Sequence, residues 1–130
     1  MSQRSEIRPY QVITNGNVAG TITSLVTIIQ KVSLVNYTFS WSGTTPVGTL
    51  KIQVSNDYAV DATGTVSNTG NWSDVSFTTG TGTAASVAVS GNTGTTTINS
   101  PLLGAYAIRA VYTASSGTGT LQGYVCGKVA

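Results

Sequence analysis

The sequence has almost none of the side chains on which enzymes depend. It contains no histidine, one cysteine and four carboxylates among 130 residues. A serine or cysteine nucleophile needs a nearby base, and no lysine or carboxylate stands in a motif that replaces histidine. Asp57 with Asp61 or Asp74 would formally supply the two carboxylates of a glycosidase, but loop-rich spacing alone is a weak signal. We therefore expect no enzymatic activity.

The same shortage argues against a metal centre or a cofactor. A single cysteine cannot form an internal disulfide, and a structural zinc site needs about four nitrogen or sulfur ligands. The loop that holds Asn56, Asp57 and Asp61 has too few carboxylates for calcium, which takes roughly six to eight oxygens. Cys126 is interpreted as a small packed side chain. No cofactor is expected.

Charge is also scarce, and this limits the partners. Charged residues make up 8% of the chain, about a third of the roughly 25% found in soluble proteins. The six basic residues are scattered, so no basic patch for nucleic acid is expected. The most apolar run, residues 22–29, is interrupted by Thr and Ser and is too short for a bilayer. The N-terminus has no apolar signal segment, which predicts synthesis in a cytosol and no membrane partner.

What the chain does contain is the pattern of β-strands. Val, Ile, Thr and Tyr dominate, and no segment shows a 3.6-residue hydrophobic period. Residues 37–41 alternate Tyr, Phe and Trp with Thr and Ser, and residues 50–54 alternate Leu, Ile and Val with polar side chains. The segment 43–48 between them contains Pro46 and two glycines. We predict a hairpin here, with Pro46 in its turn.

A second hairpin is expected at the C-terminal end. Residues 105–113 place Tyr106, Ile108 and Tyr112 on one face, and residues 120–129 return after a Ser- and Gly-rich turn. The two hairpins resemble each other weakly in sequence. Residues 42–43 of the first correspond to residues 116–117 of the second, and residues 48–50 correspond to residues 119–121. Related corners of a two-sheet sandwich would explain this resemblance.

The remaining segments have weaker signals. Tyr10 to Thr14 is a short strand that Asn15-Gly16-Asn17 ends as a turn. Residues 21–35 form one long strand or two shorter ones, and we expect another subunit or a capsid to cover their hydrophobic edge. Residues 56–70 are a loop region, either without a strand or with one edge strand, and residues 78–97 are short strands with turns at Gly91-Asn92 and Gly94.

Together these segments predict an all-β protein with one domain. About eight short strands separated by turn residues are typical of an antiparallel β-sandwich, either jelly-roll or immunoglobulin-like. Residues 1–20 are assigned to an extended N-terminal arm with the first short strand, and residues 21–130 to the sandwich. The expected core consists of Tyr37, Phe39, Trp41, Leu50, Ile52, Val54, Trp72, Phe77, Ile108, Leu121 and Val125.

Two polar positions within the domain are candidate sites. Arg109 lies in mid-strand between apolar residues, and we expect it to form a structural ion pair with Asp57, because a mid-strand charge needs a partner. Trp72 stands beside Asn71, Ser73 and Asp74. Either it packs under its loop, or it forms with Asp74 a platform on which a sugar ring stacks.

The N-terminal arm is a third candidate. Arg4, Arg8, Pro9 and Tyr10 would contact a neighbouring protein if the arm lies across it as an extended segment. The alternative is a disordered terminus.

Several short motifs between Val35 and Lys128 resemble one known group of proteins. They are Trp41-Ser42-Gly43, Pro46-Val47-Gly48-Thr49-Leu50, Val54-Ser55-Asn56-Asp57, Trp72, Ile108-Arg109, Tyr112 and Ser116-Gly117-Thr118-Gly119-Thr120-Leu121. As a set, they resemble small β-sandwich virion proteins of tailed bacteriophages, which include capsid decoration or cement proteins. The first twenty or so residues lie outside the resemblance.

The resemblance implies a structural role in a virion. Such a protein is made in the host cytoplasm, binds the outer face of the phage head and stabilises it, often as a homo-oligomer. Its partners would be the major capsid protein and other copies of itself, and the family has no catalytic residues to carry over. The alternative is a carbohydrate- or receptor-binding module of a tail or fibre, which would use Trp72 and Asp74.

Overall fold

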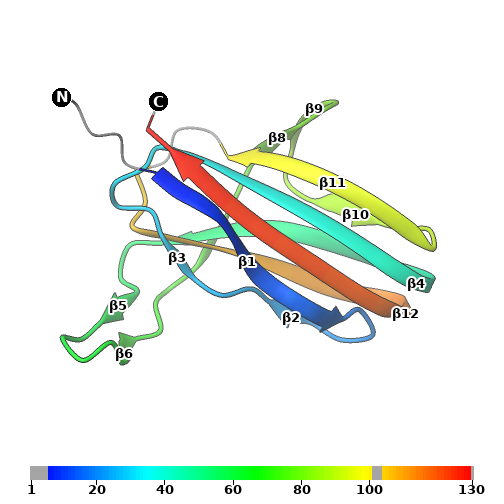
Figure 1. Cartoon of the computed structure of the whole chain (residues 1–130), viewed down its shortest axis with the longest axis horizontal. Coiled ribbons are helices and arrows are strands. Elements are labelled where there is room, and N and C mark those ends of the chain that lie inside the picture. The colour runs from blue at the N-terminus through cyan, green and yellow to red at the C-terminus, as the bar shows by residue number, and fades with distance from the viewer. Residues whose placement is uncertain (1–5, 101–103, 130) are drawn as a thin grey trace.

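The computed structural model describes residues 6–100 and 104–129, which form β-strands joined by turns and loops (Figure 1). Among these residues, no helix is long and apolar enough to cross a membrane. The strands are β1 (Glu6–Asn17), β2 (Ile22–Thr23), β3 (Thr27–Ile28), β4 (Leu34–Ser55), β5 (Ala59–Val60), β6 (Val66–Asn68), β7 (Ser73–Val75), β8 (Phe77–Thr79), β9 (Gly82–Ala84), β10 (Val87–Val89), β11 (Thr93–Ser100) and β12 (Ala107–Lys128). The prediction of an all-β antiparallel sandwich is confirmed.

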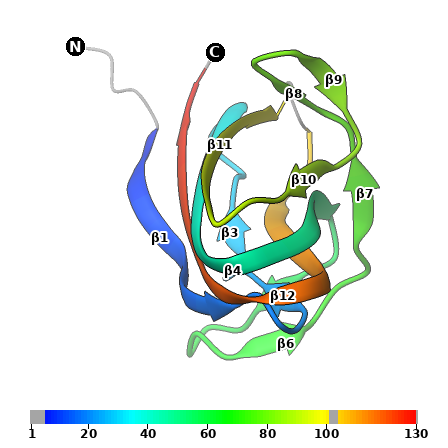
Figure 2. The ribbon, with the colours of Figure 1, turned by 90° about the vertical axis from the view of Figure 1, so that its right-hand side faces the viewer.

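Two strands of 22 residues each, β4 and β12, organise the fold. They pair antiparallel from one end to the other, from Leu34 opposite Lys128 to Ser55 opposite Ala107. Both bend near their middle, so the pair passes from one layer of the sandwich into the other (Figure 2). The two layers are therefore halves of one continuous sheet.

Other strands complete each layer. In the first layer, β1 pairs with the second half of β12, and β11 pairs with the first half of β4 and continues to β8 and β9. In the second layer, β2 and β3 pair with the first half of β12, while β7 and β10 pair with the second half of β4. A separate two-stranded hairpin, β5–β6, projects from one end (Figure 1).

Glycines allow the two long strands to bend together at the corner. A Cβ on Gly43 would lie 2.1 Å from the carbonyl oxygen of Thr118, and one on Gly119 would lie 2.2 Å from that of Ser42. Gly117 has a φ of +86°, where only glycine is unstrained, and its α-carbon faces Thr45. The two segments that resemble each other in the sequence thus lie side by side at this corner.

The predicted core is largely confirmed. Nine of its eleven residues are buried, and only Val54 and Trp72 are partly exposed. Two aromatic rings pack on glycines of neighbouring strands. The ring of Trp41 covers Gly94, where a Cβ would lie 2.2 Å from Cζ2, and the ring of Tyr112 covers Gly48. The indole of Trp41 also donates to the carbonyl of Ser90 at 3.1 Å.

The predicted hairpins are wrong in their pairing, although their strands exist. Residues 37–41 pair with β11 and β12 and not with residues 50–54. Likewise, both halves of β12 pair with β4. In each strand, the residues expected to form a hairpin turn instead form the corner. The strand bends there and continues into the other layer. Gly94 is also not a turn residue, because it lies within β11.

The N-terminal segments also differ from the prediction. The Asn15-Gly16 pair does not end a short strand, since β1 runs on to Asn17, with Asn15 at a φ of +50°. Residues 6–17 of the expected arm are an edge strand of the same sheet as the sandwich. For residues 21–35, the alternative of two shorter strands is the one found, as β2 and β3, before β4 begins at Leu34. Leu25 and Ile28 are 55% and 38% exposed, and their cover by another subunit or a capsid stays a prediction.

Candidate functional site

A connected row of polar side chains crosses the outer face of the second layer. Lys51 forms an ion pair with Asp74 at 3.4 Å, and Gln53 donates from Nε2 to Asp74 Oδ1 at 2.9 Å. Arg109 donates from Nε to Gln53 Oε1 at 3.0 Å. The strand register produces this row, because Gln53 lies opposite both Asp74 and Arg109.

The row continues from Arg109 to Trp72. The guanidinium carbon of Arg109 lies 4.2 Å from the centroid of the Trp72 ring, a cation–π contact. Partial burial lowers the pKa of Arg109. The hydrogen bond from Gln53 and the nearby Lys51 lower the pKa of Asp74. Because Lys51 and Asp74 are about half exposed, we expect their ion pair to add little to stability.

Trp72 serves as the base of the β5–β6 hairpin. Its indole nitrogen donates to the carbonyl of Thr69 at 2.8 Å, and the ring of Tyr58 lies 5.9 Å away at a tilt of 57°. With Arg109 over one face, that face is not open to a sugar ring. The arrangement matches the packed alternative for Trp72, and Asp74 is held by Lys51 and Gln53.

Asp57 closes the same base from the other side. Its carboxylate accepts hydrogen bonds from the Asn71 backbone N–H at 2.7 Å, from the Ser55 hydroxyl at 2.8 Å and from the Asn71 side chain at 2.6 Å. The backbone N–H of Asn71 is the largest cause of the lowered pKa of Asp57. The predicted ion pair between Asp57 and Arg109 is wrong, since the register turns Arg109 toward Gln53 and Trp72.

The hairpin is exposed from residue 60 to residue 69, and hydrogen bonds hold it in place. One oxygen of Asp61 accepts from the backbone N–H groups of Thr63 and Thr65, at 2.9 and 3.0 Å, and from the Thr63 hydroxyl at 2.6 Å. These bonds lower the pKa of Asp61. Val60 and Val66 lie opposite each other across the two strands and are 41% and 44% exposed.

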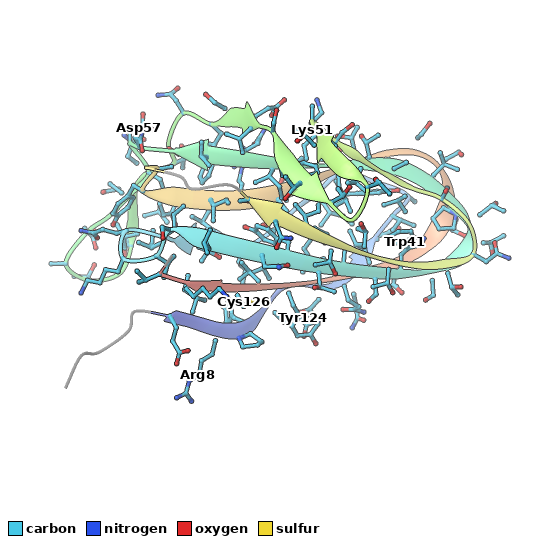
Figure 3. The ribbon with its side chains drawn as sticks, turned by 90° about the horizontal axis from the view of Figure 1, so that it is seen from above. Arg8, Trp41, Lys51, Asp57, Tyr124 and Cys126 are labelled. Carbon is cyan, nitrogen blue, oxygen red and sulfur yellow. The ribbon has the colours of Figure 1, made fainter. Side chains whose placement is uncertain are left out.

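The outer face of the first layer has a different character. Most outward residues of β11, β4 and β12 are uncharged, and Lys128 at the end of β12 is the exception; the uncharged ones are Thr93, Thr95, Thr97, Asn99, Asn36, Thr38, Ser40, Ser42, Thr120, Gln122, Tyr124 and Cys126. Hydrogen bonds link neighbouring strands on this face, between Thr38 and Thr97 and between Gln11 and Gln122. Tyr124, 44% exposed, is its largest apolar group. Figure 3 shows Tyr124 on the opposite side of the molecule from Lys51 and Asp57.

The proposed contact residues of the arm lie at the edge of this face. Arg8, Pro9 and Tyr10 are exposed on β1, Tyr10 at 52%, and Arg8 faces Glu6 at 3.6 Å. The register of β1 shifts between Ile7 and Tyr10, where Pro9 cannot donate a backbone hydrogen bond. Arg4 lies outside the described residues. A role of these residues in binding stays a prediction.

Sequence reasoning missed Gln53 and Tyr58, which connect the candidate residues, and it named Asn71 beside Trp72 without its bond to Asp57. Gln53 had a signal, because it shares a strand face with Lys51, but the strand opposite it was unknown. No cluster of three or more His, Cys, Asp or Glu side chains suited to a metal ion occurs in the described part of the chain.

Comparisons with known proteins identify one fold neighbour. No family model matches the sequence, and no curated protein is similar to it. The fold is similar to that of the SPBc2 prophage-derived protein YomS, known from a crystal structure, with a TM-score of 0.61 over 97% of this chain and 96% of that chain. The two sequences are 12% identical. The chain therefore shares its all-β fold, over nearly its whole length, with a protein derived from a prophage.

Proposed function

We propose that this chain is a non-enzymatic structural protein of a bacteriophage particle, which decorates the outer surface of the head and stabilises it. The observation that supports a phage origin is the full-length likeness in fold to a prophage-derived protein. Its partners are the major capsid protein and further copies of itself.

The outer face of the first layer is the surface we assign to the capsid. It is four strands wide, from β1 to β11, and its outward side chains on β4, β11 and β12 carry hydroxyl, amide and thiol groups without charge as far as Cys126, before Lys128 ends β12. Such groups dock by hydrogen bonds and close packing, so binding through them depends little on salt. Tyr124 supplies an exposed aromatic ring of the kind enriched in interfaces.

A particle inventory tests the proposal. Phage particles made with and without the gene for this chain would be compared by mass spectrometry and cryo-electron microscopy. We expect hundreds of copies on the icosahedral shell and less stable heads without them. A few copies confined to the tail, or none, would refute the head assignment. Binding of the purified protein on a glycan array would instead support the carbohydrate-binding alternative.

Two matched variants test the docking face. Thr38 and Thr49 are both exposed threonines of β4, but they lie on opposite outer faces of the sandwich. Purified Thr38→Lys protein should rebind to gene-deleted heads at least about tenfold more weakly than wild type, because an unpaired charge would be buried. Thr49→Lys should bind as wild type does. If Thr49→Lys rebinds more weakly than Thr38→Lys, docking would be assigned to the outer face of the second layer.

A further inference from the structure

The charges of this chain are unevenly distributed along its sequence. No Lys or Arg occurs between Lys51 and Arg109, whereas three of the four carboxylates do. Asp74 is paired with Lys51. Asp57 and Asp61 lie at the base and in the turn of the β5–β6 hairpin and are held by hydrogen bonds, with no ion pair among the described residues. The hairpin is thus an acidic projection.

The hairpin also exposes hydrophobic side chains. Val60 and Val66 form a cross-strand pair, and every residue from 60 to 69 is exposed. A two-stranded hairpin without a core is marginally stable alone. Here, Asp61 fixes the turn, while Asp57 with Asn71 and Trp72 fix the base. The valine pair is therefore presented in a fixed position, and less conformational entropy is lost when it binds.

A surface of opposite character lies where β12 ends. Lys128 is opposite Leu34 and Glu6 there. A hollow of about 420 Å³ opens beside Lys128 and Leu34, lined also by Val35 and Gly127 and, on the outer face of the first layer, by Asn36, Asn99 and Cys126. A Cβ on Gly127 would be 3.4 Å from Ile7 and from Val32.

The neighbours of those two hydrophobic residues give this surface its charge. Arg8 follows Ile7 and Lys31 precedes Val32. Lys128 lines the mainly apolar hollow, and Lys31 and the Arg8–Glu6 ion pair lie on the chain segments next to it, so this end of the sandwich has three cations and one carboxylate. We name this surface, defined by Arg8, Lys31, Leu34, Gly127 and Lys128, the basic end.

Hairpin and basic end lie at the same end of the sandwich, where β12 terminates and β5–β6 projects (Figure 1). We propose that a second copy of this chain docks here by two-fold symmetry. Each acidic hairpin lies on the basic end of the other copy, and its valine pair enters the hollow beside Leu34. An isologous dimer makes this contact twice. The carboxylates of one copy then face the cations of the other, which commits the site to a copy of this chain. The proposal does not rest on binding to a capsid.

Sedimentation velocity of the full-length protein tests the dimer and its surface. Val60→Thr and Val66→Thr keep the β-branched shape but remove a buried methyl group, and together they should raise the dimer Kd at least about tenfold. Val47→Thr is the matched control, because Val47 is 40% exposed at the corner, far from the hairpin. It should leave the Kd within about twofold of wild type. Circular dichroism confirms that each variant is folded.

Two further variants test how much the charges contribute to the dimer. Asp61→Asn keeps the acceptor oxygen of the turn and removes the charge, and Lys128→Gln removes a cation from the basic end. Each should weaken the dimer several-fold at low salt, and raising the salt should weaken wild type in the same direction. A protein that is monomeric at all concentrations, or a dimer that none of these variants weakens, would overturn the proposal. Thr38→Lys protein should remain dimeric, so failure of capsid docking and failure of this contact are distinguishable.

Discussion

Gly43 is a point at which the two long strands approach too closely for any side chain. We predict that Gly43→Ala destabilises the protein strongly. The added Cβ would lie 2.1 Å from the carbonyl oxygen of Thr118 and 2.5 Å from the α-carbon of Gly119. Both contacts are with backbone, so no side-chain rotation relieves them. The backbone of β12 would have to move away from β4 by about 1 Å to restore van der Waals distance.

The size of the effect follows from what that movement disrupts. The pairings of Thr118 with Thr44, Gly119 with Gly43 and Thr120 with Ser42 all lie at this point. Two or three weakened backbone hydrogen bonds cost about 1 kcal/mol each, and strain from overpacking adds roughly 1–3 kcal/mol. We therefore expect the free energy of unfolding to fall by about 3–6 kcal/mol. For a chain of this length, that corresponds to a decrease in Tm of roughly 11–22 °C.

Urea unfolding followed by circular dichroism, with thermal unfolding as a second measurement, provides the test. Gly80→Ala is the control, because no atom lies within 4 Å of a Cβ at Gly80. We expect the control to be unchanged or slightly more stable, since alanine restricts the unfolded chain. If Gly43→Ala unfolds within about 1 kcal/mol of the control, the proposed close pairing of β4 with β12 at the corner is wrong.

Three further predictions concern the hairpin base and the core. Arg109→Gln removes the cation over Trp72, so the free energy of unfolding should fall by about 0.5–1 kcal/mol and the tryptophan emission should change; unchanged emission would contradict the contact. Tyr112→Phe removes a buried hydroxyl that has no hydrogen-bond partner, so stability in urea should be unchanged or up to about 1 kcal/mol higher, and a clear loss would show that the hydroxyl is satisfied. The carboxylates of Asp57 and Asp61 have lowered pKa values in the folded protein, so their contribution is present above the unfolded-state pKa of about 4 and is lost as pH falls below it. NMR spectra from pH 6 to 2.5 should therefore show the hairpin losing order before the sandwich does, and simultaneous loss would contradict this order.

The alternation of residues 37–41 and 50–54 was enough to predict which side chains enter the core, because the side-chain period of a strand is independent of its neighbours. It could not predict the neighbours themselves. A short Gly- and Pro-containing segment normally indicates a hairpin turn. Here, the segment 43–48 is a bend in a continuing strand, which becomes visible only when residues 116–119 are placed against it.

The contacts within the candidate site could not be predicted from the sequence for a related reason. The sequence indicates Trp72 and Asp57 as candidates, but their partners come from segments whose pairing no local pattern specifies. Arg109 needed a partner, as expected for a mid-strand charge, yet it is satisfied by an amide and an indole and not by a carboxylate. Sequence spacing alone does not distinguish these partners.

The pairing of β4 with β12 also determines when this protein can fold. Leu34 lies opposite Lys128, and β12 contributes a strand to both layers. Neither layer is complete until β12 has left the ribosome, so the residues before it cannot fold during synthesis as an independent domain would. With most of its strand pairing between residues distant in sequence, the chain has a high contact order, and slow folding is expected. A translating ribosome therefore carries this chain with its strand edges open until β12 has emerged.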